Sequence, residues 1–187
     1  EYVPGFDAPN VRIDNAEAAA EMTDHLIGLG HRRIALIRGP SHNPLSADRL
    51  KGYRNRMSKQ GLPVPAEYLV KGDFSAESGY QGMQKLLALS SRPTAIFCAN
   101  DEMAMGAIRA AKEAKLRVPQ DVSVVGFDDI RFSEFVDPPL TTIGQPQLEL
   151  GETAMRLMLD VLAGRSAAKA VVLPHRLILR GSSRSPK

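Results

Sequence analysis

The chain has no tryptophan and only one cysteine among its 187 residues. A single cysteine cannot form a disulfide within the chain, which argues against a disulfide-stabilised secreted scaffold. That residue, Cys98, lies inside an apolar run, so we expect a buried core thiol rather than a reactive one. One unpaired cysteine is typical of a protein that works in a reducing cytoplasm.

Long apolar runs are also missing. No stretch approaches the roughly 20 apolar residues that span a bilayer, and no basic segment followed by an apolar one indicates a secretion signal. The net charge is +3 with scattered arginines, which predicts a solvated surface rather than a nucleic-acid-binding stripe. We therefore expect a soluble cytoplasmic protein without a membrane partner. The start at Glu1, without methionine, suggests a fragment of a longer polypeptide.

The usual motifs of catalysis are absent as well. The chain has no dinucleotide-binding glycine motif, no Walker loop, no zinc-protease motif and no nucleophile elbow. A rival interpretation as a hydrolase or kinase would make Asp101 and Asp128 an acid and a base, but the sequence shows no activating partner for either. We therefore predict no enzymatic activity, no cofactor and no metal site.

What the chain does have is a repeated alternation of strands and helices. Apolar, β-branched runs predict strands, and helical spacing predicts helices between them; the strands are 33–37, 67–71, 94–98 and 121–126, and the helices 16–29, 47–60, 76–89 and 101–115. This order predicts an α/β fold with a parallel, doubly wound sheet. A short extended segment at 140–143, a helix at 147–163 and a last strand at 170–180 complete the pattern.

Polar and aromatic residues follow the strand ends. Because parallel strands finish at one edge, where ligands bind, we expect these side chains around one mouth: Asp73, Phe74, Asn100, Asp101 and Asp128. The expected helix caps are Asp14 or Asn15, Ser46, Ser75, Asp101 and Asp129. His31 follows the helix-ending Gly30 and is expected to be a plain surface histidine.

Five blocks of the chain carry a family resemblance. Taken in order, they resemble the effector-binding core of the LacI/GalR family of bacterial transcription repressors: Leu29 to Ala35, Asn100 to Ala107, Asp121 to Asp129, Pro138 to Ile143, and the closing Ile178 to Ser182. The resemblance implies a periplasmic binding protein-like fold of type I, with two subdomains and a ligand between them. It also implies an N-terminal headpiece, absent from this chain, that binds operator DNA.

The resemblance implies a division of the chain into four parts. Residues 1–13 would end the N-terminal subdomain and form the first crossing strand, and residues 14–143 would form the C-terminal effector-binding subdomain. Residues 144–169 would contain a second crossing and a helix of the N-terminal subdomain. Residues 170–187 would be a returning strand and tail. Most of the first subdomain would then be missing.

Asp128 and Arg49 are the leading ligand-binding candidates. A carboxylate at a strand end can accept hydrogen bonds from the vicinal hydroxyls of a sugar or ribose, as the matching family residue does. The alternative for Asp128 is a turn or cap residue. Arg49 matches the family's ligand-binding arginine, and its spacing from Leu50 and Tyr53 leaves it facing the cleft; the alternative is a surface arginine.

The other candidates surround these two. Phe74 offers an aromatic face for stacking, unless it is tucked into the core. The resemblance also assigns ligand contacts to Asn100, Asn43, Leu45 and Gln145. Segments 44–45, 49–53 and 71–74 look like those of cytidine-type nucleoside repressors, and the lack of an arginine at position 43 argues against a purine corepressor.

An apolar group precedes the two prolines at 138–139. The family builds its dimer interface from segments that match Met105, Ile108, Phe132, Phe135 and Val136. Two exposed aromatics in a loop need a partner. We therefore expect a homodimer, although the aromatics can instead pack under the loop within one subunit.

Together these features predict the ligand-sensing and dimerisation core of a LacI-type regulator. A nucleoside or sugar effector would modulate operator binding by its different affinity for two states. The alternative is a periplasmic sugar-binding protein of a transport system. The sequence upstream would distinguish the two, since a helix-turn-helix supports the first and a secretion signal the second.

Overall fold

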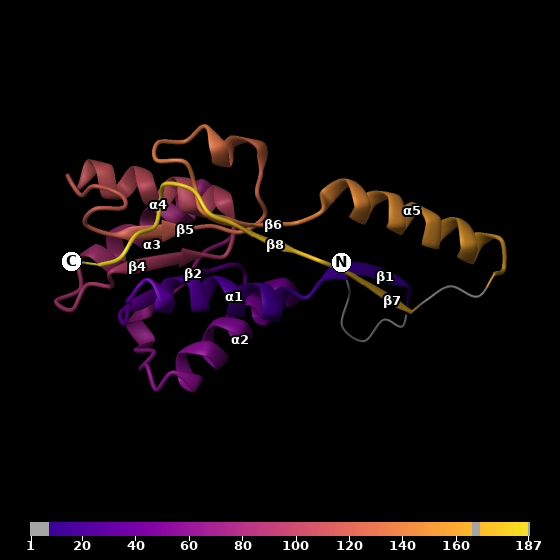
Figure 1. The fold of residues 1–187 in the computed structure, drawn as a ribbon, viewed down its shortest axis with the longest axis horizontal. Coiled ribbons are helices and arrows are strands. Elements are labelled where there is room, and N and C mark those ends of the chain that lie inside the picture. The colour runs from indigo at the N-terminus through magenta and orange to yellow at the C-terminus, as the bar shows by residue number, and fades with distance from the viewer. Residues whose placement is uncertain (1–7, 166–168, 187) are drawn as a thin grey trace.

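The computed structural model describes residues 8–165 and 169–186, which form two unequal parts (Figure 1). The larger part is a parallel sheet with helices on both faces. The smaller part contains one helix beside a pair of strands. Extended segments run between the two parts, so the chain crosses from one to the other more than once.

Four strands build the main sheet in the order β3-β2-β4-β5, and every neighbouring pair is parallel. Their bounds are β2 (Ile34–Arg38), β3 (Leu69–Lys71), β4 (Ala95–Cys98) and β5 (Ser123–Val125). Successive side chains point to opposite faces, so Ile34 and Leu36 enter one core layer while Ala35 and Ile37 enter the other. The predicted doubly wound parallel sheet is confirmed.

Two helices cover each face of this sheet. On one face lie α1 (Asn15–Gly28) and α2 (Pro44–Lys59), and on the other α3 (Ala76–Leu87) and α4 (Asp101–Glu113). Short 3-10 turns occur at η1 (Ala66–Tyr68) and η2 (Arg131–Glu134). Both faces are therefore covered; β4 and β5 are buried throughout, whereas the edge strand β3 is only partly buried.

The helix caps were predicted only in part. Asp14 and Ser75 cap α1 and α3 as expected, each accepting a hydrogen bond from a first-turn N–H. The prediction of Ser46 for α2 is wrong: the helix begins at Pro44, whose missing N–H suits a first helical position, and Asn43 is the cap. Asn100, not Asp101, caps α4.

Asp129 is not a cap either, and its role was mispredicted. Its backbone has a positive φ of 54°, and its carboxylate lies 2.8 Å from the guanidinium of Arg180. The residue therefore joins the end of β5 to the returning segment near the C-terminus.

The smaller part contains α5 (Gln147–Leu162), which lies beside β1 (Asn10–Ile13) and β7 (Ala170–Leu173). β1 and β7 are parallel, whereas β6 (Thr142–Gly144) pairs antiparallel with β8 (Arg176–Ile178) between the two parts. The single strand predicted at 170–180 is thus two strands, because Pro174 between them cannot donate a backbone hydrogen bond. Among the described residues, no helix has the length and apolar character to cross a bilayer.

The returning segment covers the outer side of β5. The Val124 amide donates to the carbonyl of Ser182 at 2.9 Å, and the Ser182 hydroxyl accepts from the Thr141 amide at 2.8 Å. Cys98 is fully buried, as predicted, and burial raises the pKa of its thiol.

The prediction for His31 is wrong, because only 1% of the residue is exposed. Gly30, with a φ of 99°, turns the chain inward before it. The His31 ring then lies 2.8 Å from the Thr94 hydroxyl through Nδ1 and 2.9 Å from the Arg184 carbonyl through Nε2. His31 therefore anchors the returning segment rather than meeting solvent.

The buried His31 makes the stability of the fold sensitive to acid. Burial lowers the pKa of His31 and of His25 below the usual 6.5. As the pH falls below 6.5, the unfolded chain therefore binds more protons than the folded chain, and the folded state loses stability. As the pH falls from 7 to 5, we expect the free energy of unfolding of a His31→Gln variant to rise relative to that of the wild type. Urea unfolding at both pH values measures this, and parallel pH profiles would contradict it.

Candidate functional site

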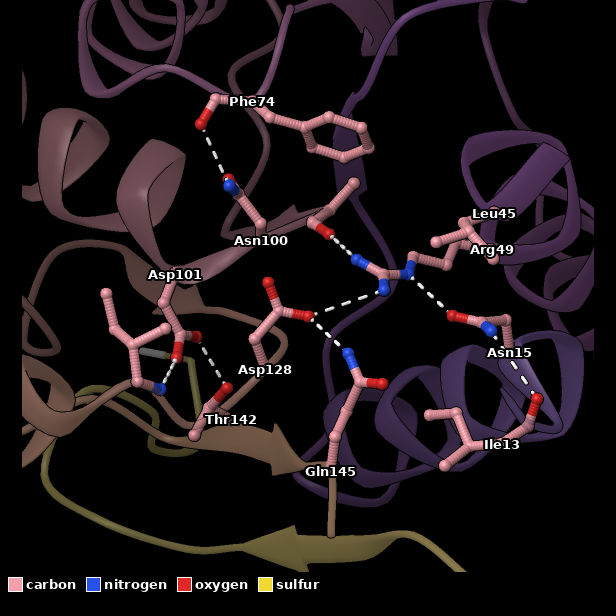
Figure 2. A network of polar contacts seen from close by, with 12 residues as sticks. Ile13, Asn15, Leu45, Arg49, Phe74, Asn100, Asp101, Asp128, Thr142 and Gln145 are labelled. Carbon is pink, nitrogen blue, oxygen red and sulfur yellow. Dashed lines mark hydrogen bonds and ion pairs between the residues drawn. The ribbon is translucent and has the colours of Figure 1, made fainter. Parts of the chain in front are cut away.

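A pocket lies at the carboxyl edge of the main sheet, with a cavity volume of about 330 Å³. All seven predicted ligand-contact residues line it, together with two that the sequence analysis did not single out, Ile130 and Gln147; the seven are Asn43, Leu45, Arg49, Phe74, Asn100, Asp128 and Gln145. Figure 2 shows how most of these side chains converge from different elements. The expected convergence of strand ends is therefore present in the geometry.

Asp128 occupies the centre of this pocket. It follows β5 with a φ of 116°, an unusual value for a residue other than glycine. Its Oδ1 accepts a hydrogen bond from Gln145 Nε2 at 2.6 Å and lies 3.3 Å from Arg49 Nη2 (Figure 2). Its amide donates to the Ile143 carbonyl at 2.8 Å. The carboxylate is therefore held from two sides, with about a quarter of the side chain exposed.

Arg49 is a buried cation and not a surface arginine. It lies in the second turn of α2, and only 3% of it is exposed. Its Nε donates to Asn15 Oδ1 at 2.9 Å, its Nη1 to the Ala99 carbonyl, and its guanidinium lies 3.7 Å from the centre of the Phe127 ring. These contacts fix the positive charge beside Asp128.

Phe74 and Asn100 form the opposite wall. The Phe74 backbone has a φ of 74°, and its carbonyl accepts a hydrogen bond from Asn100 Nδ2 at 2.8 Å. Asn100 Oδ1 accepts from the Met103 amide at 3.0 Å, which caps α4. Leu45 and Ile130 add apolar surface, so the pocket offers both an apolar wall and a polar centre.

Two of the strand-end residues expected at the mouth are not among the lining residues. Asp73 is exposed and accepts from the Ser75 amide at 2.9 Å; its hydrogen bonds with Ser75 and Ser78 lower the pKa of its carboxyl. Asp101 is fully buried behind the pocket. Neither carboxylate has the place of an acid or base beside Asp128 in the cavity.

Asp101 connects three separate segments. Its Oδ2 accepts from the Ile130 amide at 2.9 Å and the Ser133 hydroxyl at 2.7 Å, and its Oδ1 accepts from the Thr142 hydroxyl at 2.6 Å. Burial raises the pKa of this carboxyl to about 6, although the three hydrogen bonds oppose the rise. Asp101 therefore joins α4, the η2 loop and the crossing strand β6.

Several residues that shape the site were missed. Asn15 was expected only as a possible cap, yet it orients Arg49. Gln147, two residues after Gln145, places its Nε2 3.4 Å from the Asp128 carbonyl. The repeated glutamine at 145 and 147 was the available signal for Gln147, whereas Ile130 had none beyond its position after Asp128 and Asp129.

The predicted dimer residues differ in how much surface they offer to a partner. Phe132 and Phe135 are 67% and 69% exposed, so neither is tucked under its loop. Val136 is partly buried against the core, and Met105 is half-buried. Ile108 is only 4% exposed and belongs to the chain's own core, so it offers a partner almost no surface.

The chemistry of the pocket suits a ligand with several hydroxyl groups. A carboxylate accepts hydrogen bonds, the amides of Gln145 and Gln147 both donate and accept, and Phe74 offers a flat apolar face. Among residues 8–165 and 169–186, no three His, Cys, Asp or Glu side chains lie close enough to hold a metal ion.

Comparison with known proteins shows a similarity to transcriptional repressors. A model of the periplasmic binding protein-like domain matches residues 23–183. The HTH-type transcriptional repressor CytR of Escherichia coli strain K12 is 44% identical over 186 residues, covering 99% of this chain and 54% of that protein. The repressor PurR of Salmonella newport strain SL254 is 46% identical over 178 residues, covering 94% and 52%. The chain spans about half the length of these curated relatives.

Solved structures agree with this picture. A LacI family transcriptional regulator from Mycobacterium smegmatis superposes with a TM-score of 0.93 at 31% identity, covering all of this chain and 69% of that one. A complex of the transcriptional regulator CelR with cellobiose superposes with a TM-score of 0.91 at 36% identity, covering 96% and 55%.

Proposed function

The chain belongs to the periplasmic binding protein-like domain family, in the type found in LacI regulators, and we propose that it is the ligand-sensing core of such a regulator. Its ligand is a small hydroxylated effector. The observation that carries the proposal is the pocket at the carboxyl edge, where Asp128 is held by Arg49 and Gln145 with part of its carboxylate exposed.

The effector is a nucleoside or a sugar. Asp128 accepts from ring hydroxyls, and a hydrogen bond to a charged group contributes roughly 1.5–3 kcal/mol. The resemblance of segments 44–45, 49–53 and 71–74 to nucleoside repressors and the apolar wall of Phe74 and Leu45 favour a nucleoside. The cellobiose complex of CelR shows that a related fold holds a sugar. The absence of an arginine at position 43 argues against a purine base.

The four-part division predicted from the sequence belongs to this proposal. Residues 14–143 are the effector-binding subdomain, and residues 1–13 and 144–169 belong to a second subdomain, with 170–187 as a returning strand and tail. The exposed apolar side chains of α5, including Leu148 and Met155, support this division, since they would pack in that second subdomain.

The effector would act by favouring one arrangement of the two subdomains over another. The effector shifts the equilibrium between the two arrangements by an amount set by the difference in its affinity for them. In a homodimer joined through Phe132 and Phe135, a change in subdomain arrangement alters the spacing of the two headpieces and so their affinity for operator DNA. The whole regulator would then be a cytoplasmic protein without enzymatic activity, as a repressor needs none.

A periplasmic transport protein is the weaker alternative. The relatives named above are transcriptional regulators and repressors, although the domain family takes its name from periplasmic binding proteins.

A ligand screen on the full-length gene product tests the proposal. We expect one nucleoside or sugar to raise the melting temperature by several degrees, because a ligand at 100 times its Kd stabilises the folded state by about 2.7 kcal/mol. The same compound should change the affinity for an operator fragment in a gel-shift titration. A compound that binds without altering DNA affinity, or a lack of response to every nucleoside and sugar, would contradict the proposal.

A further inference from the structure

Three adjacent strand ends bring Gly39, Phe74 and Asn100 together; Phe74 and Asn100 line the pocket, and Gly39 lies behind the Phe74 ring. Gly39 follows β2, Phe74 follows β3 and Asn100 follows β4, and these strands are neighbours in the sheet. We propose that Asn100 and Gly39 are positioning residues that act on the ligand through the Phe74 ring and select effectors with a planar ring. This inference rests on the proposed function.

The polar atoms of Asn100 are already engaged within the protein. Its Oδ1 accepts from the Met103 amide at 3.0 Å, and its Nδ2 donates to the Phe74 carbonyl at 2.8 Å. The residue is only 8% exposed. Asn100 therefore acts on the backbone of Phe74 in addition to lining the pocket itself.

The hydrogen bond from Asn100 holds an unfavourable backbone conformation. Phe74 has a φ of 74°, in the left-handed region that residues with a side chain rarely adopt. This conformation aims the ring across the end of β2. Loss of the Asn100 donor would release the Phe74 backbone toward ordinary φ values and withdraw the ring from its place.

Gly39 leaves the space that the ring fills. A Cβ added to Gly39 would lie 2.2 Å from Cζ, 2.3 Å from Cε1 and 2.9 Å from Cε2 of Phe74. The ring thus lies directly against bare backbone, and any side chain at position 39 displaces it. The atoms in conflict are the far end of one side chain, so the ring would move and the fold would remain.

A ring held in this way selects by stacking. One face of Phe74 is taken by Gly39, and the residue also lines the pocket that contains Asp128. An aromatic side chain stacks more favourably on planar, unsaturated rings than on saturated ones, while Asp128 accepts hydrogen bonds from hydroxyl groups. The matching ligand combines a hydroxylated ring with a planar base, as a nucleoside does.

The test compares cytidine with methyl β-ribofuranoside, which keeps the furanose but lacks the base. Binding of both to the full-length protein is measured by calorimetry for the wild type, Gly39→Ala and Asn100→Asp. Asn100→Asp keeps an acceptor for the Met103 amide but cannot donate to Phe74 in its ionised form. Gly28→Ala is the control, because a Cβ there meets nothing within 4 Å.

We expect both wall variants to bind cytidine about tenfold more weakly and the furanoside with unchanged affinity, which reduces the selectivity for the base. Melting temperatures close to that of Gly28→Ala would show that the fold is intact. An unchanged selectivity in Gly39→Ala, or an equal loss of both ligands in Asn100→Asp, would overturn the inference while leaving the proposed function standing. A wild type that binds the furanoside and not cytidine would also overturn it, whereas one that binds no nucleoside or sugar defeats both proposals.

Discussion

An Asp128→Asn variant is expected to lose the thermal response to the effector and to bind it at least about 100-fold more weakly. Two hydrogen bonds from ligand hydroxyls to the carboxylate would lose their charge, and each charge-assisted bond is worth roughly 1.5–3 kcal/mol, with 1.4 kcal/mol equal to a factor of ten. Calorimetric titration of wild type and variant with the effector found in the screen measures the loss.

The fold should survive this substitution. Asparagine keeps an oxygen that can accept from Gln145, and Arg49 retains its bonds to Asn15 and the Ala99 carbonyl. Asp73→Asn is the matched control, because Asp73 also follows a strand of the sheet but lies outside the pocket. A full ligand response in Asp128→Asn would remove Asp128 from the binding site.

An Asp101→Ala variant is expected to lose about 3–5 kcal/mol of unfolding free energy, because three buried or half-buried donors would lose their acceptor at roughly 1–3 kcal/mol each, less the bonds that the hydroxyls recover by rotation. Asp101→Asn should cost far less. Its oxygen can accept from the Ile130 amide and the Ser133 hydroxyl while its amide donates to Thr142. Equal losses in the two variants, measured by urea unfolding, would contradict this account.

The same pair of proteins reports the raised pKa of Asp101. The folded carboxyl titrates at about 6 and the unfolded one near 3.8, so between these values the folded state binds more protons and gains stability as the pH falls. Relative to Asp101→Asn, which does not titrate, the wild type should gain about 2 kcal/mol between pH 7 and pH 4.5. Parallel profiles would show that the carboxyl is not desolvated.

Regular features were predictable because they repeat along the chain. The apolar runs at 33–37 and 94–98 indicated buried parallel strands, and parallel strands bring their carboxyl ends together whatever the loops do. That rule, with the family resemblance, predicts Asp128, Phe74 and Asn100 around one pocket. The same rule predicts Asp73 at the pocket, which is wrong, because its side chain accepts a hydrogen bond from the Ser75 amide and does not line the cavity.

Features that depend on distant parts of the chain were not predictable. His31 looked like a surface residue because its partners, Thr94, Ser123 and Arg184, come from segments far away in sequence. Asn15 and Asp101 looked like caps because local spacing suggests nothing else. Their contacts with Arg49 and with Thr142 exist only after the helices and the crossing strand have packed together.

The hydrogen bonds along β5 bear on how a growing polypeptide acquires this structure. The outer side of β5 is completed by Thr141 and Ser182, and within residues 8–165 and 169–186 β1 pairs with β7. A nascent chain that has left the ribosome only as far as α4 thus carries open strand edges, and such edges recruit other chains. Productive folding must therefore wait for late-synthesised segments, and translation that stalls before residue 182 should yield aggregates rather than a smaller stable domain.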